Sequence, residues 1–475
     1  MTQPHPGAAE AGAPGSPEPA EARSYGSGAR ILSIGLALTG VVTFAYFSLA
    51  TYALGDQAYQ AVSLLWAITF MVCSVVYRPI EQLLARTLAD ARGHGRSGGR
   101  DLRVAVLLEA GAGIGTVALA LIFKGGLQEH VFSADPDLYW VFVAAIAAYS
   151  VSYFARGWLA GSGRPELYGA LVFIESSGRC LFPIAALIGL TEGSLAVALG
   201  IAAAPLLSLI VVPLALRGGI APAESVIEAE REIEALSPDG PPGESLPEDA
   251  HATRAGAAGG GTALTFRAGL VFALSVVVVM AAEQTLITAG VLTEGTGAAA
   301  LVATTGAAAA IFNAFLVARA PLQLFQAIQS TLLPHLAELR TSGDQAAAAK
   351  ALWQTLLAIA VFAGTVSLGL LVLGPWAMGI VFEYDWPYTA TSLALVGVGM
   401  GLHLAGGTLN QSALAHGRAP RAAVVWALAA AFFLAWMLAE PVAEPVMRAA
   451  SGYALASGLL LLGLLAVESR SLRRS

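Results

Sequence analysis

Residues Ser63–Arg86, SLLWAITFMVCSVVYRPIEQLLAR, decide how this chain is organised. The stretch opens as an unbroken apolar run, which is expected to stop at Arg78-Pro79 and to continue as a short amphipathic helix. An apolar span that ends among arginines indicates on which side of a bilayer it ends. The apolar face of the short helix carries Ile80, Leu83, Leu84 and Leu88, and its polar face carries Glu81, Gln82, Arg86 and Asp90.

The composition is that of an integral membrane protein. The 475 residues are 56% hydrophobic and only 12% charged, with a mean hydropathy of +0.70, whereas soluble domains carry about 25% charged residues. Both cysteines, Cys73 and Cys180, lie in apolar spans, so neither a disulfide framework nor a zinc site is indicated. We expect them to pack as small hydrophobic residues.

Apolar stretches long enough to cross a bilayer recur along the chain, each of about 20 residues. Their number is twelve, six on either side of a long polar stretch, so we predict an all-α polytopic membrane protein with two six-helix lobes. The spans lie at 31–54, 58–77, 102–123, 138–158, 167–190, 194–216, 264–292, 298–317, 351–373, 388–409, 422–438 and 449–467.

Polar segments divide these spans into domains. Residues 1–30 are rich in Ala, Gly, Pro and Glu and are expected to form a disordered tail. A signal peptide fits less well, because the first apolar span is too long for one. The lobes are expected at 31–217 and 263–468, with a linker at 218–262 and a short tail at 469–475.

Basic residues predict the orientation. With the N-terminus inside, the inner segments hold twenty-two Arg and Lys residues and the outer loops hold only Lys124 and Arg448. This asymmetry predicts a cell-membrane protein with both termini in the cytoplasm.

A weak internal repeat places two arginines at equivalent positions. The segment VYRPIEQLL from Val76 resembles VARAPLQLFQ from Val317, and each follows the second span of its half. Because six spans are an even number, the halves enter the membrane from the same side and form parallel repeats around a central cavity, as in alternating-access transporters. Three arginines are candidates for a cytoplasmic gate: Arg78, Arg319 and Arg156, which lies at the end of the fourth span. The alternative is that they are interfacial anchors.

Ionisable groups within apolar spans are costly, by about 2.5–3.5 kcal/mol each, and are functional candidates. Glu175 and Arg179 are spaced i,i+4, so they share a helix face and can pair. They either form an internal ion pair or line the cavity, with Arg179 reaching an anionic phosphate. The further candidates for cavity or substrate-binding residues are Glu109, Glu283, Gln284, Asn313 and His403.

Two of these candidates have alternative roles. Glu283 has no partner in its own span, so it either pairs with another helix or binds a proton. His403 is either a packed neutral imidazole or a proton relay.

Motifs of catalysis are missing from the sequence. It contains neither GxxxxGK[ST] nor HExxH, and the glycines at 111–115 and 397–401 lie in apolar spans, where close helix packing explains them. We expect no enzymatic activity, no catalytic residues, no cofactor, no metal and no nucleic-acid partner.

The chain resembles the oligosaccharidyl-lipid flippases of the MOP superfamily, the polysaccharide biosynthesis membrane proteins. The resemblance rests on the twelve spans in two halves and on a few local segments. These are LSIGL from Leu32, AYF from Ala45, LGDQAY from Leu54, YRPIEQ from Tyr77 and RGWLAGSGR from Arg156.

The resemblance implies that a lipid-linked oligosaccharide crosses from the inner to the outer leaflet. The glycan would pass between the lobes while its lipid stays in the bilayer, with a proton or sodium ion as a coupling partner. MATE-like export of cations, lipid II flipping and a non-transporting scaffold of a glycan assembly complex are the alternatives. We expect a monomer, because each repeat has its partner in the same chain.

Overall fold

The computed structural model shows an all-α, multi-pass membrane protein. It describes residues 38–93, 99–132, 134–217, 261–296, 306–317, 319, 345–383, 386, 388–415 and 417–472. Ten helices in this part of the chain are long and apolar enough to cross a membrane. Two shorter apolar helices, Leu38–Ala53 and Ala307–Val317, bring the described apolar helices to the expected twelve.

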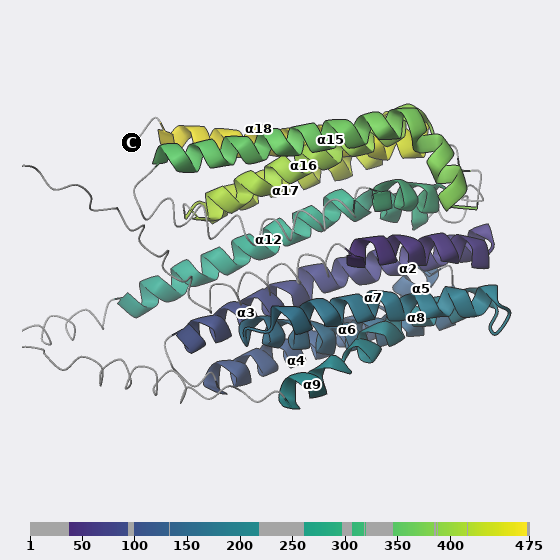
Figure 1. Ribbon diagram of the computed structural model, residues 1–475, viewed down its shortest axis with the longest axis horizontal. Helices are drawn as coiled ribbons and strands as arrows, with labels where there is room; N and C mark the ends of the chain where they lie inside the picture. Colours follow the sequence, from purple (N-terminus) through teal and green to yellow (C-terminus); the bar gives the residue numbers. More distant parts are fainter. Residues whose placement is uncertain are drawn as a thin grey trace, which may run out of the picture.

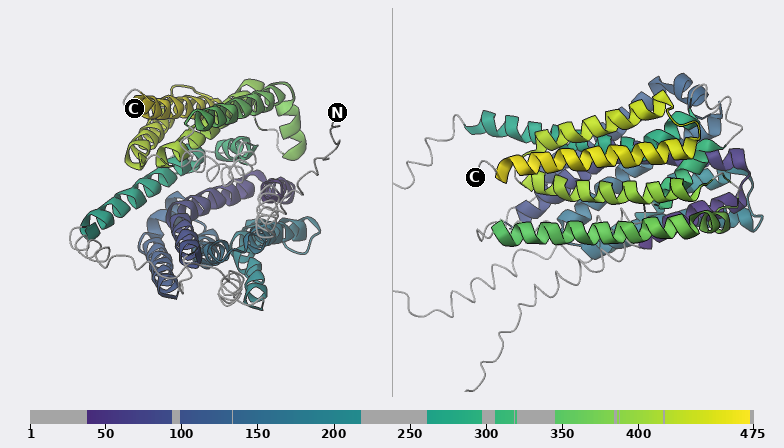
Figure 2. Two further views of the ribbon diagram at one scale, coloured as in Figure 1. Left: turned by 60° about the vertical axis from the view of Figure 1, so that its left-hand side comes forward. Right: turned by 90° about the horizontal axis from the view of Figure 1, so that it is seen from above.

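The helices form two lobes, as expected (Figures 1 and 2). Figure 1 shows α12 running diagonally between α2–α9 on one side and α15–α18 on the other. The first lobe contains α2 (Asp56–Val72), η1 (Cys73–Tyr77), α3 (Arg78–Gly93), α4 (Gly99–Ile122), α5 (Lys124–His130), α6 (Pro136–Gly161), α7 (Pro165–Leu187), α8 (Gly193–Ser208) and α9 (Val211–Arg217). The second contains α12 (Gly261–Gly295), α15 (Gln345–Val381), α16 (Ala390–Ala415), α17 (Ala419–Ala439) and α18 (Pro445–Leu472).

Helix boundaries follow proline and capping signals. The carboxylate of Asp135 accepts hydrogen bonds from the backbone N–H groups of Asp137 (2.8 Å) and Leu138 (3.2 Å), and Pro136 occupies the first turn of α6. The last two spans are separate helices, because α17 ends before the Glu440-Pro441 turn.

Several expected polar segments fall beyond the described residues. The tail at 1–30 and nearly all of the linker at 218–262 lie outside them, as does most of the second copy of the repeat. At the other end of the chain, α18 continues to Leu472, so helix extends into the segment expected to be a tail.

The apolar run gives way at Arg78-Pro79 to a more polar helix, as expected, and the helix is not interrupted there. It widens into the π-helical turn η1 and continues as α3, so that Asp56–Ala89 is one continuous helix. Proline lacks an N–H and its ring crowds the carbonyl four residues earlier. A π-helical turn just before Pro79 is a way to accommodate that missing bond without ending the helix.

The buried side of α3 does not coincide with its apolar face. Glu81 is buried and accepts a hydrogen bond from the hydroxyl of Tyr168 (2.9 Å), while Leu83 is exposed. Tertiary packing decides this, because α3 lies against the glycines of α6: a Cβ on Gly157 would come within 2.8 Å of the Glu81 carbonyl. The close approach turns the Glu81 face inward and leaves Leu83 on the outside.

Candidate functional site

Three charged side chains form a buried cluster inside the first lobe. Glu175, on α7, bonds to Arg156 of α6, and its other oxygen lies 3.3 Å from Nη2 of Arg179. The three residues are 8% (Arg156), 3% (Glu175) and 2% (Arg179) exposed. The expected i,i+4 pair therefore forms, but a second arginine shares its carboxylate and leaves the cluster with one net positive charge.

Neighbouring polar groups on α6 complete the cluster. The hydroxyl of Ser152 donates to Glu175 (3.1 Å), and Nη2 of Arg179 donates to the hydroxyl oxygen of Tyr149 (3.1 Å). Residues 149, 152 and 156 recur at helical spacing, so one face of α6 presents them all to α7. The Nε and Nη1 atoms of Arg179 remain without a hydrogen-bond partner in the described part of the chain.

Aromatic rings connect this cluster to the second lobe. The guanidinium carbon of Arg179 lies 4.1 Å from the centre of the Trp66 ring, which stacks on Phe70 with 5.7 Å between ring centres. Arg319, of the second lobe, lies 5.3 Å from the ring of Phe70 and 5.5 Å from that of Phe312. Two guanidinium groups thus flank a continuous aromatic stack, and cations bind favourably to such ring faces.

Arg319 is the cation of this stack that belongs to the second lobe. It lies two residues beyond helix Ala307–Val317 and is half-buried. No carboxylate of the described residues pairs with it. Among the described residues, its guanidinium group therefore lies against aromatic faces and not against an acidic side chain.

Charged and polar groups on α12 face both lobes. Glu283 is half-buried and interacts electrostatically with Arg78, which follows η1 in the first lobe, and with His403 of α16 and Tyr453 of α18. The imidazole of His403 packs against Trp426, with 5.4 Å between ring centres. Glu283 thus lies between the lobes and opposite a cation.

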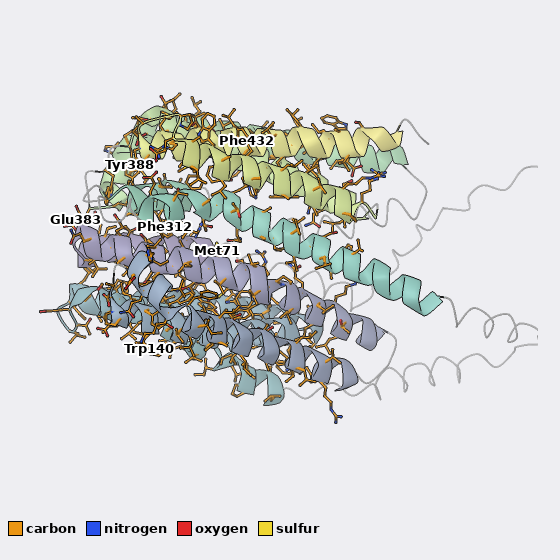
Figure 3. All side chains as sticks on the ribbon, turned by 180° about the vertical axis from the view of Figure 1, so that it is seen from behind. Met71, Trp140, Phe312, Glu383, Tyr388 and Phe432 are labelled. Atoms are coloured by element: carbon orange, nitrogen blue, oxygen red, sulfur yellow. The ribbon has the colours of Figure 1, made fainter. Side chains whose placement is uncertain are left out.

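Hydroxyl groups join the lobes at one end, which we call the closed end. Ser48 and Tyr52, on helix Leu38–Ala53, donate to the carbonyls of Val381 and Ile380 at the end of α15, each at 2.6 Å. Figure 3 labels Glu383, just beyond α15, at this end of the molecule. The closed end lies opposite the described C-terminus (Figure 1).

Further contacts extend the closed end inward. The hydroxyl of Tyr59 bonds to the side-chain oxygen of Asn313, and the ring of Phe44 lies 5.7 Å from that of Phe382. Asn313 is buried and its amide nitrogen has no partner among the described residues. Asn313 is therefore part of the contact between lobes.

The expected site residues do not form a single cluster. Arg156, Glu175 and Arg179 are inside the first lobe, whereas Arg78, Glu283, Asn313 and Arg319 lie where the lobes face each other. Gln284 is buried on α12 with its carbonyl oxygen unpartnered in the described part of the chain. Glu109 lies apart from these, on α4.

The sequence pattern does not reveal the aromatic residues that lie between the arginines of the two lobes. Trp66 and Phe70 are spaced i,i+4 in an apolar span, and that spacing is also typical of ordinary core packing. Their role follows only from the arginines that approach them from other helices.

Solved structures with the same architecture are known. A MATE family multidrug resistance transporter of the MOP superfamily, in an inward-facing conformation, matches with a TM-score of 0.64 and 12% identity over 93% of this chain and 96% of that one. The outward-facing conformation of such a transporter matches with a TM-score of 0.59 and 12% identity over 94% and 96%. The chain has the fold of MATE transporters.

A transporter of the MOP superfamily from Pyrococcus furiosus is similar to the same degree. It matches with a TM-score of 0.60 and 12% identity over 94% of this chain and 96% of that one, and it is described by a binding pocket of reverse polarity that suggests a different function. No family model and no curated protein matches the sequence.

Proposed function

We propose that this protein is an alternating-access transporter that moves a lipid-linked, phosphate-bearing oligosaccharide across the membrane. The fold supports transport between two lobes, because structures of this fold are described in inward-facing and outward-facing conformations. The glycan would move between the lobes, and the lipid would remain in the bilayer. The protein would act as a monomer, with its arginine-rich side and both termini in the cytoplasm.

The observation that carries the proposal is the position of Arg319. Its guanidinium group lies between the lobes, with aromatic faces beside it and no acidic partner among the described residues. A guanidinium fork binds phosphate through two parallel hydrogen bonds. Arg78 lies on the opposite lobe but already faces Glu283, so Arg319 is the guanidinium group that we expect a phosphate between the lobes to meet.

Export of a cation is the second candidate, and Glu283 is the observation that favours it. A half-buried carboxylate between the lobes could bind a cationic substrate or a coupling ion. However, Glu283 already faces Arg78, which offsets its charge. The pocket of reverse polarity in the Pyrococcus furiosus transporter indicates that pocket charge differs among proteins of this fold.

The closed end supports an inward-facing state. The lobes are joined at the end opposite the C-terminus, by Ser48 and Tyr52 with the end of α15. If the C-terminus is cytoplasmic, the joined end is the outer one, and substrate would enter from the cytoplasmic side.

The test is transport by the purified protein in liposomes that contain a fluorescent, pyrophosphate-linked oligosaccharide lipid. Arg319→Gln removes the charge and Arg319→Lys keeps it without the planar fork. The matched control is Arg421→Gln, which removes an exposed arginine at the start of α17. A lost charge-assisted hydrogen bond costs about 1.5–3 kcal/mol, so we expect transport by Arg319→Gln to fall about 10- to 100-fold.

The proposal is supported if the transport rate decreases from wild type to Arg319→Lys and further to Arg319→Gln, while Arg421→Gln transports at the wild-type rate. A cationic dye expelled in a Glu283-dependent manner, while the lipid stays in its leaflet, establishes the exporter instead. Lipid exposure unaffected by either Arg319 variant contradicts the role of Arg319, and the absence of any transport favours the scaffold.

A further inference from the structure

Glu109 is a buried carboxyl group that the site between the lobes does not use. It is 4% exposed, on α4, and the polar group against its side-chain oxygens is the neutral hydroxyl of Ser150, with no charged hydrogen-bond partner in the described part of the chain. An ionised carboxylate in such surroundings is costly, and the group is stabilised instead by holding a proton. Its burial therefore contrasts with that of Glu175, which two arginines neutralise.

The groups that face Glu109 cannot neutralise a negative charge. From η1 these are Cys73 and Tyr77, from α3 Glu81, and from α6 Ser150. Glu81 is itself a carboxyl group, and the other three are neutral. Within the described residues, then, no cation compensates for ionisation of Glu109.

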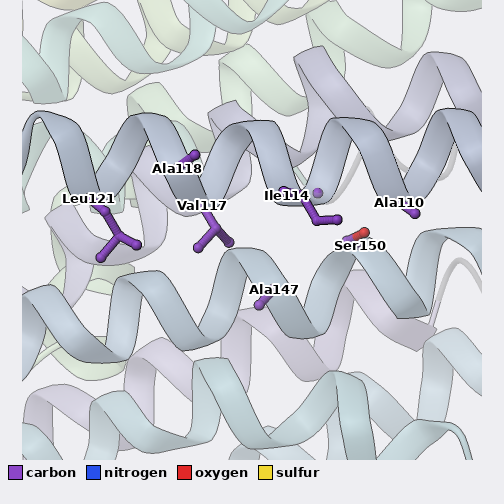
Figure 4. Close-up of a pocket in the computed structure, with 8 residues that line it drawn as sticks. Ala110, Ile114, Val117, Ala118, Leu121, Ala147 and Ser150 are labelled. Atoms are coloured by element: carbon purple, nitrogen blue, oxygen red, sulfur yellow. The ribbon is translucent and has the colours of Figure 1, made fainter.

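An apolar groove of about 400 Å³ lies between α4 and α6, and Ser150, the hydroxyl-bearing neighbour of Glu109, is one of its lining residues (Figure 4). It extends along α4 from Ala110, the residue that follows Glu109 in the sequence, to Leu121. Eleven helical steps correspond to about 16 Å, which is roughly half the thickness of the hydrocarbon core. The groove is open on the side where α4 exposes Ile114, and that side of an apolar helix faces lipid.

We propose that Glu109 is a proton-binding site of the first lobe, reached from the bilayer through the groove between α4 and α6. Ser150 connects the two, because it lines the groove and its hydroxyl lies beside the Glu109 carboxyl group. The ligand of this site is a proton. The groove also gives a hydrophobic molecule dissolved in the lipid access to the protonated carboxyl group. This part of the proposal rests on the proposed transport function: the proton at Glu109 couples transport to a proton gradient.

The first experiment is labelling of the full-length protein in lipid nanodiscs with dicyclohexylcarbodiimide, followed by mass-spectrometric mapping. The acid O–H adds across one C=N bond of the reagent, and the adduct rearranges to an N-acylurea that retains every atom of both reactants. We expect Glu109 to be labelled at neutral pH, with labelling falling as the pH is raised. Glu175 is the internal control and is expected to stay unlabelled, because two arginines pair with its carboxylate.

A groove-filling variant tests the route. Ala147 is exposed and lines the groove, so Ala147→Leu narrows it without overpacking the core. We expect labelling of Glu109 to slow severalfold in Ala147→Leu. Labelling that is equally fast in this variant contradicts access through the groove, and no labelling of Glu109 at any pH overturns the proposal.

Coupling is tested separately with Glu109→Gln in liposomes. We expect this variant to lose the stimulation that an imposed proton gradient gives to wild type, while basal transport persists. An undiminished stimulation contradicts coupling through Glu109. If wild type is labelled at Glu109 but transports nothing, the proton site stands and the proposed function fails.

Discussion

Arg179 and Trp66 lie face to face inside the first lobe, with the guanidinium carbon 4.1 Å from the centre of the indole ring. The same ring stacks on Phe70, whose ring also lies beside Arg319. A charge buried among helices of one lobe is thereby in contact, through two rings, with a charge of the other lobe. A substitution of either ring or either arginine should therefore affect the residues that contact it.

Trp66→Leu should destabilise the protein. The substitution leaves a cavity and removes the ring on which Arg179 rests, and large-to-small changes of this kind cost about 2–4 kcal/mol. The matched control is Trp140→Leu, because Trp140 is half exposed and its ring contacts Lys124 at the surface (5.1 Å). Thermal unfolding in detergent, followed by circular dichroism, should show a clear loss for Trp66→Leu only, and equal losses would contradict a special role of the stack.

Within the charge cluster, Glu175→Gln should be more destabilising than Arg179→Gln. The first leaves two buried arginines without their carboxylate, whereas the second leaves the Arg156–Glu175 pair intact. Breaking a buried pair costs about 3–5 kcal/mol, and we expect the full cost only for Glu175→Gln. The measurement is the unfolding temperature of both variants under one set of conditions, and the reverse order would show that Arg179 holds the cluster together.

Glycine positions on α6 and α4 should differ in their tolerance of alanine. A Cβ on Gly161 would lie 2.7 Å from Cβ of Leu88 and 2.9 Å from the carbonyl of Ala85, so Gly161→Ala must push α3 away. In contrast, Gly115 has no atom within 4 Å of such a Cβ. Alanine favours helix over glycine by about 1 kcal/mol, so Gly115→Ala should leave stability unchanged or raised.

The yield of folded protein and its unfolding temperature test this pair of variants. A Gly161→Ala protein as stable as wild type would mean that the approach of α3 to α6 is looser than these distances indicate.

Locking the closed end should stop transport. Cysteines at positions 48 and 381, in a chain whose own Cys73 and Cys180 are replaced by alanine, would connect the first helix to the end of α15, where Ser48 contacts Val381. We expect oxidation to abolish transport and reduction to restore it, because alternating access requires this end to open. Each single-cysteine variant serves as the control, and transport that continues after complete cross-linking would contradict the role of the closed end.

The sequence determined the membrane-spanning architecture and little of the site. Hydropathy is enough to predict spans, since every residue of an apolar helix in lipid must be compatible with hydrocarbon whatever its neighbours are. The i,i+4 spacing of Glu175 and Arg179 likewise predicted their contact, because both belong to one helix. The spacing of residues along one helix therefore predicts contacts within that helix.

The tertiary structure decided which charged side chains lie close to one another. Arg156 joins Glu175 because α6 packs against α7, and Glu81 is buried because glycines let α3 approach α6. Such contacts depend on distances between separate helices, which the order of residues along one helix does not specify. For the same reason, only the packed structure distinguishes Glu175, held between two arginines, from Glu109, which no cation reaches within the described chain.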